Sequence, residues 1–150
     1  MARSTQLKRS VKSRPAALSI ARYNKNNMDS EHLSVVFDQK FYLNNQSMPG
    51  LSAINIDVET GTILKKEQQL NYSTRLAERF RKQCQKQNGL ELSENEWPTE
   101  MLRKLLSSDG GIFFYTPVGL EIGFNYNGVN NQFGWMTATI KDYEEYLKKM

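Results

Sequence analysis

The sequence predicts an α+β domain in which an antiparallel sheet of about five strands carries two to three helices on one face. Three observations lead to this fold class. Segments with the alternating pattern of strands form two groups, one before residue 59 and one after residue 110. Helical patterns lie between the two groups and at the C-terminus. Short turns rich in Gly and Asn connect neighbouring strands, and such turns favour antiparallel pairing.

The clearest strand spans residues 118–126, where every even position is apolar and most odd positions are polar or Gly. A period of two is typical of a strand with one buried face, so we expect Phe124 to be buried and Glu121 to face solvent. Residues 112–116 are β-branched or aromatic and are followed by Pro117. This segment therefore predicts a hairpin with the clearest strand.

Turn-forming residues separate the remaining strands. Residues 127–128 are Asn-Gly, which suits a tight turn, and the strand pattern resumes over residues 133–140. In the first group, strands are predicted for residues 32–43 and 51–58, with the turn formers of residues 44–50 between them. Apolar residues alternate along one side of the first of these strands, and we expect that side to face the core: Leu33, Val35, Phe37 and Phe41.

The helical patterns have recognisable ends. Ser73 and Thr74 are capping residues before a helix that ends at Gly89. A shorter helix is predicted for residues 99–107, and a terminal helix for residues 141–150. The first of these helices has an apolar face made of Leu76, Ala77, Phe80 and Cys84.

Charge divides the chain into an arm and a body. Residues 1–27 contain seven of the 20 Lys and Arg and no acidic residue, which leaves 13 basic and 16 acidic residues in 28–150. We therefore predict a basic flexible arm over residues 1–27 and a single α+β domain over residues 28–150. Within the arm, residues 16–23 have the pattern of an edge strand or short helix. Clustered cations attract polyanions, and the candidate polyanion-binding residues are Lys8, Arg9, Lys12 and Arg14.

The sequence shows no transmembrane segment, because no apolar run reaches the length of about 18 residues that a spanning helix needs. It also lacks the apolar middle region of a signal peptide. Its single Cys84 cannot form an internal disulfide. The localisation is not determined by these features. It is extracytoplasmic if an export or membrane segment has been trimmed, and cytoplasmic otherwise.

We expect no catalytic residue, cofactor or metal ion. His32 is the only histidine, and it lies at a strand start with no nucleophile motif near it. One His and one Cys do not make a zinc site, and the carboxylates lack the spacing of a calcium-binding loop. No pair of carboxylates is brought together by the sequence pattern in the way that glycoside hydrolysis requires.

The loop between the last two strands is the candidate partner-binding site. Its amide, Gly and aromatic residues hydrogen-bond and stack at low entropic cost. The structural alternative is a plain turn with Phe133 and Trp135 in the core. The candidate partner-binding residues are Tyr126, Asn127, Asn130, Asn131, Gln132 and Trp135.

Five short segments resemble one known family in order and spacing: residues 55–61, 76–87, 114–120, 124–127 and 137–143. The chain resembles, over about residues 32–147, the domain of unknown function found at the C-terminus of lysozyme-sensing anti-sigma factors and some peptidoglycan deacetylases. Two departures are visible. Residues 45–50 replace the family's Gly-Gly-Ala-His turn, and residues 125–127 keep only part of its Asn-Pro-Tyr.

Two functional hypotheses follow. The loop and the resemblance together imply a noncatalytic domain of the bacterial cell envelope that recognises a lysozyme-like protein or a peptidoglycan-type glycan. The alternative is an intracellular regulatory protein whose basic N-terminal arm contacts nucleic acid. Salt separates them, because binding to a polyanion weakens steeply as salt rises, whereas binding through the loop should tolerate salt.

Overall fold

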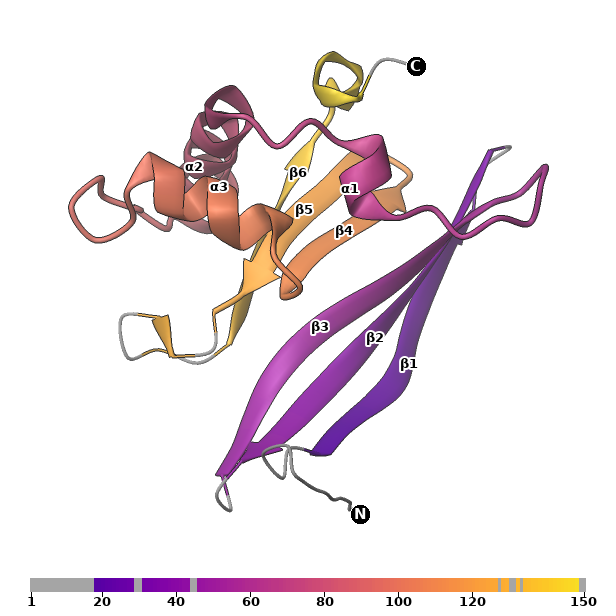
Figure 1. Ribbon diagram of the computed structural model, residues 1–150, viewed down its shortest axis with the longest axis horizontal. Coiled ribbons are helices and arrows are strands. Elements are labelled where there is room, and N and C mark those ends of the chain that lie inside the picture. Colours follow the sequence, from indigo (N-terminus) through magenta and orange to yellow (C-terminus); the bar gives the residue numbers. More distant parts are fainter. Residues whose placement is uncertain are drawn as a thin grey trace.

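The computed structural model describes residues 18–28, 31–43, 46–126, 128–129, 132 and 134–148, and for residues 18–28, 41 and 43 it describes the backbone alone. It contains two antiparallel sheets of three strands each, with the main helices beside the second sheet (Figure 1). The predicted α+β class with antiparallel strands is confirmed. The strands, however, divide into two sheets instead of forming the single sheet that the sequence predicts.

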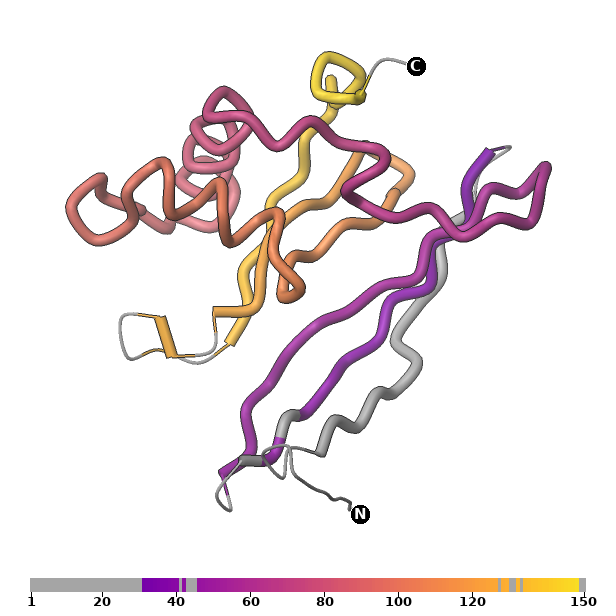
Figure 2. Tube along the Cα trace, viewed as in Figure 1, coloured from indigo at the N-terminus to yellow at the C-terminus, as the bar shows by residue number. Residues whose placement is uncertain are grey.

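The first sheet is a long meander of β1 (Leu18–Met28), β2 (His32–Leu43) and β3 (Gln46–Asp57). β2 and β3 pair along their whole length and run side by side in Figure 2. β1 pairs with β2, so the last part of the segment assigned to the basic arm lies in a strand. β3 begins inside the segment predicted as a turn and is longer than the sequence pattern indicates.

The second sheet contains β4 (Gly111–Thr116), β5 (Gly119–Asn125) and β6 (Trp135–Ile140), with β5 in the middle. The hairpin predicted around Pro117 is confirmed. The Thr116 hydroxyl oxygen closes its turn by accepting a hydrogen bond from the Gly119 N–H at 3.1 Å.

Helices cover one face of the second sheet. α1 (Lys66–Gln69) is a single turn, and it is followed by α2 (Thr74–Asn88) and α3 (Thr99–Ser107). The Ser73 hydroxyl caps α2 by accepting a hydrogen bond from the Leu76 N–H at 3.2 Å. The predicted cap and the predicted helices over this part of the chain are confirmed.

The predicted terminal helix is replaced by a short 3₁₀ turn, η3 (Tyr143–Tyr146). The chain after this turn pairs with the segment before α2. Leu147 forms a bridge with Leu70, and the Lys148 N–H donates to the Gln69 carbonyl at 2.8 Å. A helix cannot continue here because these backbone groups are used in extended pairing with another segment.

The main core lies between the second sheet and the helices. Phe124 of β5 is fully buried, and its ring centroid lies 5.6 Å from that of Phe80 on α2 and 5.9 Å from that of Trp97. Burying a side chain of this size stabilises the fold by about 1.5–3 kcal/mol. The sequence pattern identified this face of β5 correctly.

A smaller core lies on the other face of the second sheet. The side of β2 that faces this core is opposite to the side that the sequence pattern predicts. The side chains of β2 that point inward are Ser34 and Val36, both fully buried. Val36 packs with residues of β3 and β4, namely Leu51, Ile112 and Phe114, with Ala53 at the margin. The predicted inward side of β2 is only half-buried at Leu33, Val35 and Phe37, and the side chain of Phe41 lies outside the described part.

Polar contacts between the sheets explain this reversal. β4 is an edge strand, and it meets the face of the first sheet instead of another strand. Asn55 Nδ2 donates to the Phe113 carbonyl at 2.8 Å, and the Tyr115 N–H donates to Ser34 Oγ at 2.9 Å. Ser34 Oγ in turn donates to Asn55 Oδ1 at 2.6 Å. The two small polar residues that face inward therefore supply hydrogen-bond partners for the backbone groups at the edge of β4. Larger apolar side chains have no donor or acceptor for these groups.

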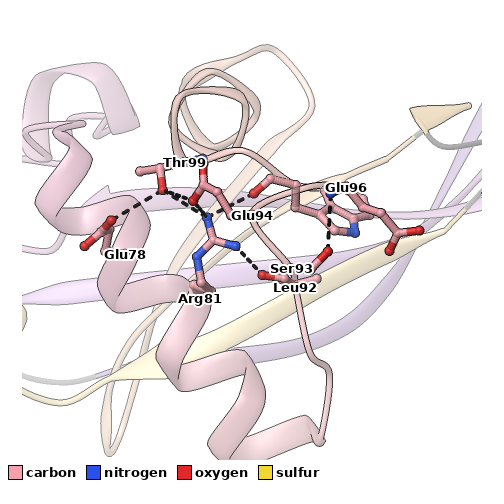
Figure 3. A network of polar contacts seen from close by, with 8 residues as sticks. Glu78, Arg81, Leu92, Ser93, Glu94, Glu96 and Thr99 are labelled. Atoms are coloured by element: carbon pink, nitrogen blue, oxygen red, sulfur yellow. Dashed lines mark hydrogen bonds and ion pairs between the residues drawn. The ribbon is translucent and has the colours of Figure 1, made fainter.

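A second polar network closes the connection between α2 and α3 (Figure 3). Arg81 donates to the carbonyl oxygens of Leu92 and Trp97, and it pairs with Glu94 at 3.0 Å. The N–H and the hydroxyl of Thr99 both donate to the Glu94 carboxylate. These bonds lower the pKa of the carboxylate, and the bond from the N–H has the larger effect. The network holds Trp97 in place against the main core.

We expect Asn55→Ala to reduce the free energy of unfolding by about 1–3 kcal/mol, because it leaves the Phe113 carbonyl and the Ser34 hydroxyl buried without this partner. Urea denaturation measures the change. The control is Asn95→Ala, an exposed position where the change should stay within about 0.5 kcal/mol. Equal effects of the two substitutions would contradict the role of Asn55.

Phe124→Ala should cost about 3–5 kcal/mol through lost burial and the cavity it leaves. Chemical denaturation of this variant is compared with that of Val118→Ala, which removes an apolar side chain that is 62% exposed in the neighbouring turn. A small loss for Phe124→Ala would show that its face of β5 is not the core face.

Arg81→Met keeps the aliphatic stem but removes the donors to Leu92 and Trp97, so we expect a loss of about 1–3 kcal/mol in the free energy of unfolding. The matched control is Lys82→Met on the adjacent exposed position, with a change within about 0.5 kcal/mol. Thermal or urea melts that do not distinguish the two variants would argue against the network.

Candidate functional site

The loop after β5 is closed by backbone hydrogen bonds. The Tyr126 N–H donates to the Gly134 carbonyl at 2.9 Å, and the Gly128 N–H donates to the Gln132 carbonyl at 2.8 Å. Gln132 is exposed at this closure. The other amide residues predicted for the site, Asn127, Asn130 and Asn131, lie outside the described residues.

The two described aromatic residues of the predicted site lie on opposite faces of the second sheet. Tyr126 packs on the helical side, with its ring centroid 6.2 Å from that of Trp97. Trp135 begins β6 and lies on the side of the first sheet, where 39% of its surface is exposed. The sheet therefore separates two residues that the sequence grouped into one site. Trp135 is also not a core residue, so the structural alternative fails for this side chain.

Trp135 lines a cleft of about 200 Å³ between the two sheets, which we call the inter-sheet cleft. The other lining residues come from five strands, β2 to β6. They are Val36, Leu51, Phe114, Thr116, Glu121 and Thr137. Val36, Leu51 and Phe114 are buried residues of the smaller core, so the cleft has an apolar floor with polar groups at its side.

Glu121 is the charged group of the inter-sheet cleft. The sequence predicted an exposed glutamate, but the side chain is half-buried on the face of the sheet that carries Trp135. Its carboxylate accepts hydrogen bonds from the hydroxyls of Thr137 at 2.6 Å and Thr139 at 2.5 Å. Within the described part of the chain, no ion pair to Glu121 is present.

The threonine hydroxyls fix the orientation of the Glu121 carboxylate. A carboxylate has about four acceptor positions, and the two hydroxyls use only part of them. The remaining acceptor positions can receive hydrogen bonds from a ligand without rearrangement of the side chain. A small binding cleft combines an apolar floor with a few fixed polar groups, and the inter-sheet cleft has both, together with the partly exposed Trp135.

The predicted polyanion-binding residues lie outside the described part of the chain: Lys8, Arg9, Lys12 and Arg14. Their role remains a prediction from charge alone.

His32 and Cys84, whose side chains could in principle act as a base and a nucleophile, both pack against other side chains. The His32 ring stacks on the Tyr115 ring with centroids 3.7 Å apart and an angle of 5°. Cys84 is buried on α2, and burial, with a smaller effect of the Glu121 charge, raises the pKa of its thiol to about 12. The thiolate form is therefore scarce at neutral pH.

The described residues contain neither a metal-binding cluster nor a membrane-spanning helix. No group of three or more His, Cys, Asp or Glu side chains there is placed to hold a metal ion. No helix in the same part of the chain has both the length and the apolar character needed to cross a membrane.

Part of the inter-sheet cleft is visible in the sequence pattern. Alternation places Glu121 on the polar face of its strand, and Thr137 and Thr139 alternate with apolar residues in the last strand. These patterns identify polar faces, but they do not give the register that aligns Glu121 with Thr139. They also cannot show that a second sheet covers this face at Val36 and Leu51.

Comparison with known proteins does not identify the chain. No protein-family model matches it, and no curated protein matches it. The resemblance to the domain of lysozyme-sensing anti-sigma factors therefore stays a prediction.

Proposed function

We propose that the chain is a noncatalytic recognition domain of the bacterial cell envelope that binds a peptidoglycan-type glycan in the inter-sheet cleft. The observation that carries the proposal is that the partly exposed Trp135 and the Glu121 carboxylate, which two threonine hydroxyls hold, line the same cleft. The alternative ligand of the same domain, a lysozyme-like protein, is tested in the same experiment.

The chemistry of the cleft favours a sugar ring. One face of a sugar ring carries C–H groups that pack on an indole, and its hydroxyls are donors for which Glu121 provides acceptor positions. The cleft volume of about 200 Å³ is below the roughly 300 Å³ at which pockets for drug-sized ligands begin. It is therefore suited to one ring or one side chain instead of a large cofactor.

Because Glu121 gives the cleft a negative charge, the salt dependence of binding distinguishes a glycan ligand from a protein ligand. A glycan bound through hydroxyls and C–H packing should tolerate salt. A protein that inserts a cationic side chain between Glu121 and Trp135 would bind through an ion pair and a cation–π contact. Binding of that kind weakens at high ionic strength because salt screens exposed charges.

We expect Trp135→Ala to weaken the binding of a muropeptide by at least about tenfold, which corresponds to about 1.4 kcal/mol. Glu121→Gln should weaken it about fivefold, since hydrogen bonds to charged groups exceed neutral ones by about 1 kcal/mol. Isothermal titration calorimetry at low and high salt measures both effects. Trp135 is 39% exposed and therefore partly packed, so the melting temperature of Trp135→Ala is measured as well and its affinity is determined below that temperature.

Val118→Ala is the matched control, because this exposed apolar residue lies in a turn outside the inter-sheet cleft. The double change Asn130→Ala with Asn131→Ala measures the contribution of the loop separately. The proposal is wrong if the parent chain has no affinity for the muropeptide. Binding of a lysozyme-like protein in its place, with loss at high salt, would favour the protein ligand.

A further inference from the structure

Side chains take the place of missing neighbour strands at both edges of the second sheet. The edge of β4 is satisfied by Ser34 and Asn55, as described above. At the edge of β6, the Thr139 carbonyl accepts from the side-chain amides of Gln83 and Gln87, each at 2.9 Å. The Thr139 N–H also donates to the Gln87 side chain at 2.8 Å. Such coverage prevents an edge from pairing with another chain.

β3 is an edge strand of the first sheet, and its outer edge is covered on both sides of Ala53. The Asn125 side chain accepts from the Leu51 N–H at 2.9 Å and donates to the Leu51 carbonyl at 3.0 Å. The Leu64 N–H donates to the Asn55 carbonyl at 2.8 Å. In a strand, residues two apart direct their N–H and C=O groups to the same side. The backbone groups of Ala53 therefore point to this outer edge, between the two covered points.

Ala53 is the uncovered position between these two points of the outer β3 edge. Among the described residues, none forms a hydrogen bond with its outward N–H or C=O group. A pocket of about 530 Å³ lies over this position, and Ala53, Leu51, Asn55 and Asn125 contribute to its lining. The pocket thus encloses the uncovered position and the groups that cover its neighbours.

Exposed apolar side chains accompany the uncovered position. Ile54 is 43% exposed and Ile63 is 59% exposed, and both line the same pocket. Large apolar side chains beside free backbone groups of an edge strand are the features by which an extended peptide adds to a sheet. The main-chain groups form hydrogen bonds with the peptide backbone. The apolar side chains of the protein contact every second side chain of the peptide.

We propose that this pocket, which we call the β3-edge pocket, binds an extended peptide segment of a partner protein. One peptide residue pairs its N–H and C=O with the C=O and N–H of Ala53, and an apolar side chain of the peptide contacts Ile54 and Ile63. Pairing is centred on this residue, because Asn125 bonds both outward groups of Leu51 and the Leu64 N–H bonds the carbonyl of Asn55.

The geometry favours a peptide over a ligand with a single amide. In a trans amide the N–H and C=O bonds point in opposite directions, so one acetamido group cannot bond both groups of Ala53. A residue in an extended peptide carries its own N–H and C=O on the same side, and it can form both bonds at once. This inference goes beyond the proposed glycan site, from which the pocket differs in all lining residues except Leu51.

The test uses the full chain, labelled with ¹⁵N, and four blocked tripeptides of the form acetyl-Thr-X-Thr-amide, where X is Ala, Val, Leu or Phe. The probes are added to about 10 mM, which detects dissociation constants near 1 mM. We expect the amide resonance of Ala53 to shift with at least one probe. Hydrogen exchange of this amide should slow at least fivefold at saturation.

N-methylation of the probe gives a matched pair. Methylating the N–H of residue X removes the donor to the Ala53 carbonyl, and it should weaken binding at least tenfold. Methylating the N–H of the following Thr changes a group that points away from β3, so that binding should change less than threefold. Equal effects of the two methylations would overturn the strand-like pairing.

Variants of the protein give an independent test. Ile63→Ser should weaken the best probe at least threefold, whereas Val118→Ser, at a similarly exposed position outside the pocket, should leave it unchanged. Trp135→Ala should also leave it unchanged, which separates this inference from the glycan proposal. The inference fails if no probe shifts the Ala53 resonance. It also fails if shifts occur only around Trp135, or if N-acetylglucosamine shifts Ala53 as strongly as the peptides do.

Discussion

The structure depends on the way in which the edge of one sheet is joined to the face of another. Ser34 and Asn55 are cross-strand neighbours on β2 and β3, and they bond to each other and to the edge of β4. The bonds to Phe113 and Tyr115 replace those that an additional strand would form. Because buried backbone groups must be paired, this contact fixes which face of the first sheet turns inward.

The same contact determines where cavities can form. The first sheet touches the second along β4, where Val36 and Leu51 pack against Ile112 and Phe114. On one side of this contact, the face of β5 and β6 is left partly open and forms the inter-sheet cleft with Trp135 and Glu121. On the other side, the outer edge of β3 is left uncovered at Ala53 and faces the β3-edge pocket. Both candidate sites therefore result from joining two sheets through one edge strand.

On the helical side of the second sheet, the packing is apolar and contains neither candidate site. Its core is continuous and apolar, and Phe124 contacts both Phe80 and Trp97 there. The Arg81 network (Figure 3) and the capped ends of α2 hold this layer together. Tyr126 belongs to this layer through its contact with Trp97, which explains why it is unavailable to the cleft on the opposite face. The helical layer packs on the sheet that carries Glu121 and Trp135.

The sequence alone determined the features that depend on local periodicity and on turn or cap chemistry. It identified the α+β class, the hairpin around Pro117, the buried face of β5 at Phe124, and the start of α2 at Ser73. Only the tertiary structure decided which side of β2 is buried, because hydrophobicity favours Leu33 and Val35, whereas the unpaired edge of β4 requires Ser34. It also separated Tyr126 from Trp135 and brought Glu121 to Thr137 and Thr139, since register and sheet packing join residues far apart in the chain.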